Sequence, residues 1–241
     1  MKKLLGLILV TGIAVSARAS DTGDIQKLDS RLQSATTTLE QIESVKDKAI
    51  PDEIARRAWC VAVVPSVIKG AIGIGAEYGQ GVATCRNKNG WSAPVFIRLA
   101  GGSFGFQIGG QGTDLILVAV NQKGMESLLQ SKFKIGGNAS ASAGPIGRTA
   151  QAATDIGMRA QLLTWSRSRG IFAGVDLSGV SVSQNALDTN TLYGTFHNFD
   201  TILSGQVPPP PVTRPFLRAV TQYFGDARQW YEQRDERKKE H

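Results

Sequence analysis

Between Trp59 and Val182 the chain is a series of short apolar runs, rich in β-branched residues, with glycines both between and inside them. Cys60–Val64 is one such run, and Ala71–Tyr78 is followed after a short glycine-containing break by Val82–Cys85. Runs of this length predict strands, and intervals this short favour antiparallel pairing over βαβ units. Glycine inside a strand marks a bend, a bulge or a close approach of two backbones. The sequence therefore predicts an α+β fold: a strongly coiled, mainly antiparallel, glycine-rich sheet or partial barrel with flanking helices.

Both ends of this β-rich body carry an amphipathic helical pattern. From Ile25 to Ile42 the apolar residues are spaced alternately three and four apart, which predicts one buried helical stripe. A second stripe runs from Leu217 to Tyr231, after the proline run 208–211, in a helix expected to begin near Thr213. Aromatic residues recur every seven positions beside it: Phe216, Tyr223 and Trp230. Such an edge suits a membrane interface, whereas packing against the body is the ordinary alternative.

The first residues have the three parts of a secretory signal. Lys2 and Lys3 precede the apolar run Leu4–Val15, and Ala17-Arg18-Ala19 is a small-x-small cleavage site. The run is shorter than the roughly 20 residues that span a bilayer, although an uncleaved anchor is the alternative. We expect a signal peptide over 1–19, a helix within 20–50, a β-rich domain over 51–207 and a spacer with a helix and tail over 208–241. The expected location is periplasmic or secreted.

The composition limits the partners and the chemistry. Without Lys2, Lys3 and Arg18 the 27 basic residues fall to 24 against 20 acidic ones, a net charge of +4. No dense basic block suggests a nucleic-acid partner. The cysteines, Cys60 and Cys85, predict one disulfide in an oxidising compartment, with two buried free thiols as the alternative. The two histidines lie far apart outside any ligand-spaced cluster, so we expect neither a metal nor a cofactor.

One motif suggests catalysis. Gly101–Gly105 matches the G-x-S-x-G pattern around Ser103. Downstream, Asp176 or Asp188 and then His197 follow in the order of a hydrolase triad. A nucleophile elbow needs a strand, a sharp turn and then a helix, but Ser103 is followed by an alternating, strand-like stretch. We therefore expect no enzyme, and a serine hydrolase using Ser103 stays a distant alternative.

Several segments, taken in order, match a known pattern. They are Val64-Pro65, Gly73 to Gly81, Gly90-Trp91-Ser92-Ala93-Pro94, Gly102 to Gly109, Ala141 to Arg148, Trp165 to Val175, and Asn190 with Leu192-Tyr193-Gly194. In that order the chain resembles the SYLF domain, also described as a Ysc-type actin-regulator domain, over roughly residues 50 to 210. Each motif is weak alone, and together they are specific.

The resemblance implies a lipid-binding module. Eukaryotic members of this family bind phosphoinositides and some bind actin, whereas many bacterial members resemble this chain in having a signal peptide and little else. For an exported protein we expect anionic phospholipid surfaces as the partner. The candidate cations are Arg56, Arg57, Lys69, Lys132, Lys134, Arg148, Arg167 and Arg169. The alternative is an envelope structural module, with a protein partner or a second copy bound through the amphipathic helices.

Overall fold

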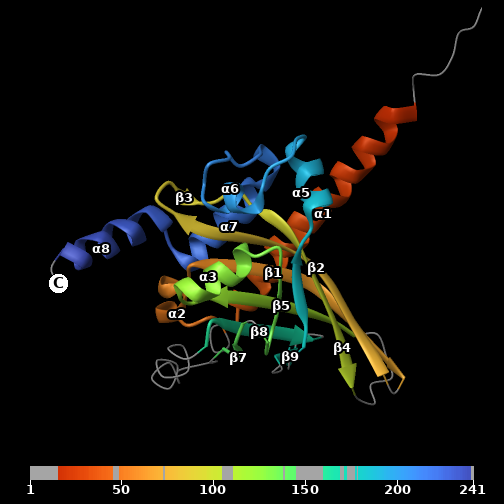
Figure 1. The fold of residues 1–241 in the computed structure, drawn as a ribbon, viewed down its shortest axis with the longest axis horizontal. Helices are drawn as coiled ribbons and strands as arrows, with labels where there is room; N and C mark the ends of the chain where they lie inside the picture. Colours follow the sequence, from red (N-terminus) through yellow and green to blue (C-terminus); the bar gives the residue numbers. More distant parts are fainter. Residues whose placement is uncertain are drawn as a thin grey trace, which may run out of the picture.

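The protein is described by a computed structural model. The structure describes residues 16–45, 49–72, 74–104, 111–137, 139–144, 160–168, 171–172, 177 and 179–239. Figure 1 shows a strongly curved sheet with helices on both of its faces and with α8, the last helix, projecting from one end.

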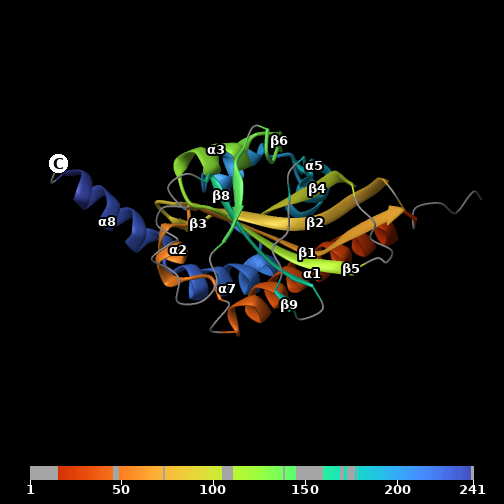
Figure 2. The same ribbon diagram turned by 90° about the horizontal axis from the view of Figure 1, so that it is seen from below.

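One sheet contains all of the strands among these residues. They are β1 (Cys60–Ile72), β2 (Ile74–Asn87), β3 (Gly90–Trp91), β4 (Val95–Phe104), β5 (Gln111–Ala119), β6 (Lys132–Lys134), β7 (Ala141–Ala143), β8 (Leu162–Ser168), β9 (Ile171–Phe172) and β10 (Ser181–Gln184). Their order is β6-β10-β4-β2-β1-β5-β8-β7, with β3 beside β2 and β9 beside β8. Only the pair β7–β8 is parallel within the described ranges. The sheet curls into a half-barrel (Figure 2), which confirms the predicted fold class.

The helices lie before, between and after the strands. They are α1 (Ser16–Glu43), α2 (Asp52–Arg57), α3 (Gln122–Leu129), α5 (Ala186–Tyr193), α6 (Phe199–Leu203), α7 (Arg214–Phe224) and α8 (Ala227–Lys239), with a 3-10 turn, η1, at Pro211–Thr213. Helix α1 begins within the expected signal peptide, whose first fifteen residues lie outside the described ranges. No helix that the structure describes combines the length and the apolar character needed to cross a bilayer.

Each face of the sheet is covered by helices. The stripe predicted from Ile25 to Ile42 lies on α1, and its members from Leu28 onward are buried against one face beside α7. Helices α3 and α6 pack on the opposite face. Because β1 is buried on both sides, its first residues are apolar without alternation.

Glycine inside β2 marks a close approach to β1. A Cβ at Gly81 would lie 2.4 Å from the carbonyl oxygen of Val63, and one at Gly79 would lie 2.8 Å from a methyl group of Val64. Here the β1–β2 register shifts between Val63 and Ile68. The glycines therefore admit a β-bulge, as the pattern predicted.

The C-terminal helix is two helices, so the prediction of one continuous helix is wrong. Gly225 has a φ of 79° and breaks the chain between α7 and α8. The Asp226 side chain then accepts a hydrogen bond from the Arg228 amide at 2.7 Å. Phe216 is fully buried against the sheet, while Trp230 packs edge-on against Trp59 at 5.1 Å. These aromatic residues hold the helices to the body.

Candidate lipid-facing surface

A row of cross-strand partners crosses the sheet at the edge of the area that helix α1 covers. Lys134 of β6 pairs with Ser181 of β10, which pairs with Ala100 of β4. Ala100 pairs with Tyr78 of β2, and Tyr78 pairs with Ile68 of β1. Directly opposed residues in antiparallel strands point to the same face, so these five side chains lie on one surface.

This surface is open and partly apolar. Ile68 is 56% exposed and Tyr78 is 48% exposed, which is unusual for large side chains at the centre of a sheet. Ala100 and Lys134 are also exposed, as is Lys132, two residues along β6. Figure 1 shows these ends of β1, β2 and β4 extending past the helices. We call this surface the distal face and define it by Ile68, Tyr78, Ala100, Lys132 and Lys134.

The basic edge of the distal face is hollowed. A cavity of about 510 Å³ is lined by Ala100, Gly101, Gly102, Lys132, Phe133, Lys134, Gly179 and Ser181. Small residues from β4 leave this space open, while the lysines and the Ser181 hydroxyl supply hydrogen-bond donors. The arrangement suits an anionic group next to an apolar surface.

A polar network fixes the boundary between α1 and the distal face. Arg31 of α1 forms an ion pair with Asp188 of α5 and donates to Gln80 of β2 at 2.7 Å. Asn185 links this pair to β4, because it donates to Asp188 and accepts from Arg98 at 2.9 Å. Helix α1 is thereby held at the border of the Ile68–Tyr78 pair. Ser30 and Ser34 of α1 line a hollow beside this pair, which stays about half exposed.

The other candidate cations are not gathered here. Arg167 contacts Asp114 at 3.4 Å and also donates to Gln41, so it holds the later part of α1 to β5 and β8. Arg56 and Arg57 are exposed at the end of α2.

Three candidate cations lie wholly or partly outside the residues that the structure describes. The backbone of Lys69 lies in β1 opposite Glu77, and its side chain is not described. Arg148 and Arg169 lie outside the described residues. Of the candidate cations whose side chains are described, only Lys132 and Lys134 lie on the distal face.

The two cysteines are joined. Cys60 and Cys85 are directly opposed in β1 and β2 and form a disulfide inside the core, where both are almost fully buried. The bond ties together the ends of the two strands that lie away from the distal face.

The residues considered for catalysis lie in separate elements, with Ser103 in β4 and Asp188 in α5. Ser103 lies in β4 opposite Gly75, and the segment 105–110 that follows is outside the described residues. Asp176 also lies outside them. The Asp188 carboxylate forms an ion pair with Arg31 and accepts a hydrogen bond from the Asn185 carboxamide. Within the described ranges, no group of three or more potential metal ligands is found.

Sequence reasoning missed the apolar half of the distal face. Ile68 follows the buried apolar run Cys60–Val64, and the bulge between Val63 and Ile68 changes which residues face α1. A tyrosine beside Glu77 in an otherwise small, apolar run was the available signal.

Comparison with known proteins gives a consistent set of similarities. A family model described as Ysc84, Las17-binding protein actin regulator, matches residues 100–223. LAS seventeen-binding protein 3 of Saccharomyces cerevisiae is 34% identical over 178 residues, which cover 72% of this chain and 39% of that protein. Human SH3 domain-containing YSC84-like protein 1 is 32% identical over 166 residues, covering 68% of this chain and 48% of that protein. The chain thus spans less than half the length of these relatives.

Proposed function

The chain belongs to the Ysc84 (SYLF) family, and from this premise we propose that it is a non-catalytic domain that binds anionic phospholipid surfaces outside the cytoplasm. The proposal places the distal face against the lipid. The export signal expected in residues 1–19 gives it access to phosphatidylglycerol and cardiolipin.

The observation that carries the proposal is the combination of two exposed apolar side chains with two exposed lysines on one face. Ile68 and Tyr78 bring apolar area that is favourable to remove from water. Lys132 and Lys134 lie at the edge of the same face, beside the hollow that Ser181 helps to line. A peripheral lipid binder needs both elements, an apolar group to insert and cations to meet the head groups.

Electrostatics favours an anionic surface over a neutral one. Each lysine or arginine near such a surface contributes about 1 kcal/mol, so the two lysines contribute about 2 kcal/mol. This corresponds to roughly 30-fold in binding. The net charge of +4 that remains without Lys2, Lys3 and Arg18 adds a long-range attraction.

A protein partner is the second candidate function. The yeast relative is named for binding Las17, and an exposed apolar face also suits a protein surface. Binding to a protein would use the same Ile68–Tyr78 pair but would not require lipid.

Co-sedimentation with phosphatidylglycerol vesicles, compared with phosphatidylcholine vesicles, tests the proposal. The double variant Lys132→Gln, Lys134→Gln should bind phosphatidylglycerol roughly 30-fold more weakly. The matched control is Arg56→Gln with Arg57→Gln, which removes the same charge from the end of α2. If both double variants lost the same affinity for the vesicles, binding would depend on net charge alone and not on the distal face. Absence of binding by the unmodified chain would favour the protein partner.

A further inference from the structure

A second cavity lies at the other end of β2, away from the distal face. It has a volume of about 520 Å³ and is bounded by the β2–β3 turn, the segment 205–209 and the junction of α7 and α8. Tyr78 and Asn87 are separated by nine residues along β2, roughly 30 Å. The cavity is therefore separate from the proposed lipid surface, and its size is that of a small-molecule site.

The floor of the cavity is a buried carboxamide. Asn87 is 7% exposed, and its Oδ1 accepts a hydrogen bond from the Asn89 amide at 2.8 Å. Its Nδ2 has no hydrogen-bond partner among the described residues. Gly205 has a φ of 84° and passes so close that a Cβ there would lie 2.5 Å from the Asn87 carboxamide. The Nδ2 nitrogen has almost no surface exposed to the cavity and is covered by Gly205, so the Asn87 carboxamide shapes the floor rather than reaching a ligand.

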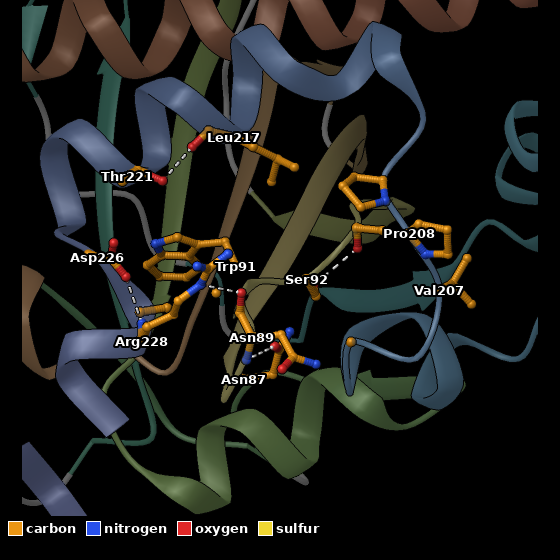
Figure 3. Close-up of a pocket in the computed structure, with 15 residues that line it drawn as sticks. Asn87, Asn89, Trp91, Ser92, Val207, Pro208, Leu217, Thr221, Asp226 and Arg228 are labelled. Atoms are coloured by element: carbon orange, nitrogen blue, oxygen red, sulfur yellow. Dashed lines mark hydrogen bonds between the residues drawn. The ribbon is translucent and has the colours of Figure 1, made fainter. Parts of the chain in front are cut away.

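One wall of the cavity is a fixed aromatic ring. Trp91 donates its indole N–H to the Gly225 carbonyl at 3.0 Å, and the Arg86 guanidinium lies 4.7 Å from its ring centroid. Figure 3 shows Trp91 and Pro208 on opposite sides of the cavity, with the Asn87–Asn89 turn below them. Because its N–H is satisfied and Arg86 does not line the cavity, the ring offers an apolar platform there.

The charged groups of the cavity balance each other. The Asp226 carboxylate accepts from the Arg228 amide at 2.7 Å, and Arg228 Nε donates to the Asn89 carbonyl at 2.7 Å. In the lining itself the Asp226 carboxylate offsets the Arg228 guanidinium, and the Arg86 charge lies behind Trp91 where a phosphate in the cavity would not contact it. A purely apolar ligand would leave the polar groups of Asn89, Asp226 and Arg228 in the lining without a partner. Hydroxyl groups both donate and accept, so they fit this set of groups.

From these features we infer that the cavity binds a neutral sugar ring. The C–H face of the ring stacks on Trp91, and its hydroxyls meet the Asn89 carboxamide together with Asp226 and Arg228. The inference goes beyond lipid binding, because it assigns a second ligand to the opposite end of the sheet.

Ligand-observed NMR and calorimetry with the full chain test this site, using glucose and N-acetylglucosamine as probes. Saturable binding of at least one probe is expected, with a dissociation constant on the order of 1 mM. Asn89→Ala should weaken it about tenfold, because one hydrogen-bonding group is lost from an exposed turn. Trp91→Ala should abolish it. The matched control is Asn198→Ala. It removes an exposed carboxamide that makes no capping hydrogen bond to α6, and sugar binding should be unchanged.

Phosphatidylcholine vesicles carrying a neutral glucosyl-diacylglycerol distinguish a lipid-borne sugar from a free one, and binding in either arm supports the site. Failure of both sugars and of the glycolipid would overturn it, as would full binding by Asn89→Ala. Asn89→Ala should sediment normally with phosphatidylglycerol vesicles, so this test is independent of the distal face.

Discussion

Glu43, in the last turn of α1, is a carboxyl group with a perturbed environment. Burial raises its pKa to about 7, more than the Ile50 amide lowers it by donating a hydrogen bond, and Asp52 raises it slightly further. A carboxyl whose folded pKa lies above its unfolded value stabilises the fold at low pH, where it is protonated in both states. That stability is lost as the pH rises from about 4.5 to about 7.

Glu43→Gln should therefore stabilise the protein at pH 8 and change little at pH 4, because glutamine resembles the protonated acid. Thermal unfolding followed by circular dichroism at the two pH values measures the difference. Glu40→Gln, at an exposed position one turn earlier on the same helix, is the control. A shift in Tm of the same size at both pH values would contradict the assignment.

Arg86, at the end of β2, connects β2 to α2, α7, β3 and α8 through its side chain. Its guanidinium donates to the carbonyl of Ala55 in α2 at 3.0 Å and to that of Phe224, which ends α7. It also lies over the rings of Trp91 in β3 and Trp230 in α8. Burial lowers its pKa to about 10, so it keeps its charge at neutral pH. One side chain thus joins two helix ends and two aromatic rings.

Arg86→Ala should destabilise the fold by about 3 kcal/mol, because two buried carbonyls lose their donor and two rings lose their contact. Urea unfolding measures this loss. Arg218→Ala, at an exposed position on α7, should stay within about 0.5 kcal/mol of the unmodified chain. Similar stabilities for the two variants would show that Arg86 does not join these elements.

At the scale of the whole molecule, the sequence predicted the architecture better than the sites. The period of Ile25 to Ile42 and the short glycine-rich runs sufficed for the α+β half-barrel, because periodicity is a local signal. The distal face depends on a β-bulge and on where α1 crosses the sheet, and both are tertiary features. The Asn87 cavity likewise joins segments more than a hundred residues apart.

The central claim is that the distal face meets the lipid, and the fluorescence of a dye placed there tests it most directly. The described residues contain no free cysteine, so Ile68→Cys can be labelled with an environment-sensitive dye under non-reducing conditions. Phe196→Cys is the control, since Phe196 is also an exposed apolar residue, 69% exposed, but lies in the α5–α6 loop. With phosphatidylglycerol vesicles we predict a blue-shifted, brighter emission from the dye at position 68 and little change at position 196. An unchanged emission at position 68 while the protein co-sediments with the vesicles would contradict the claim.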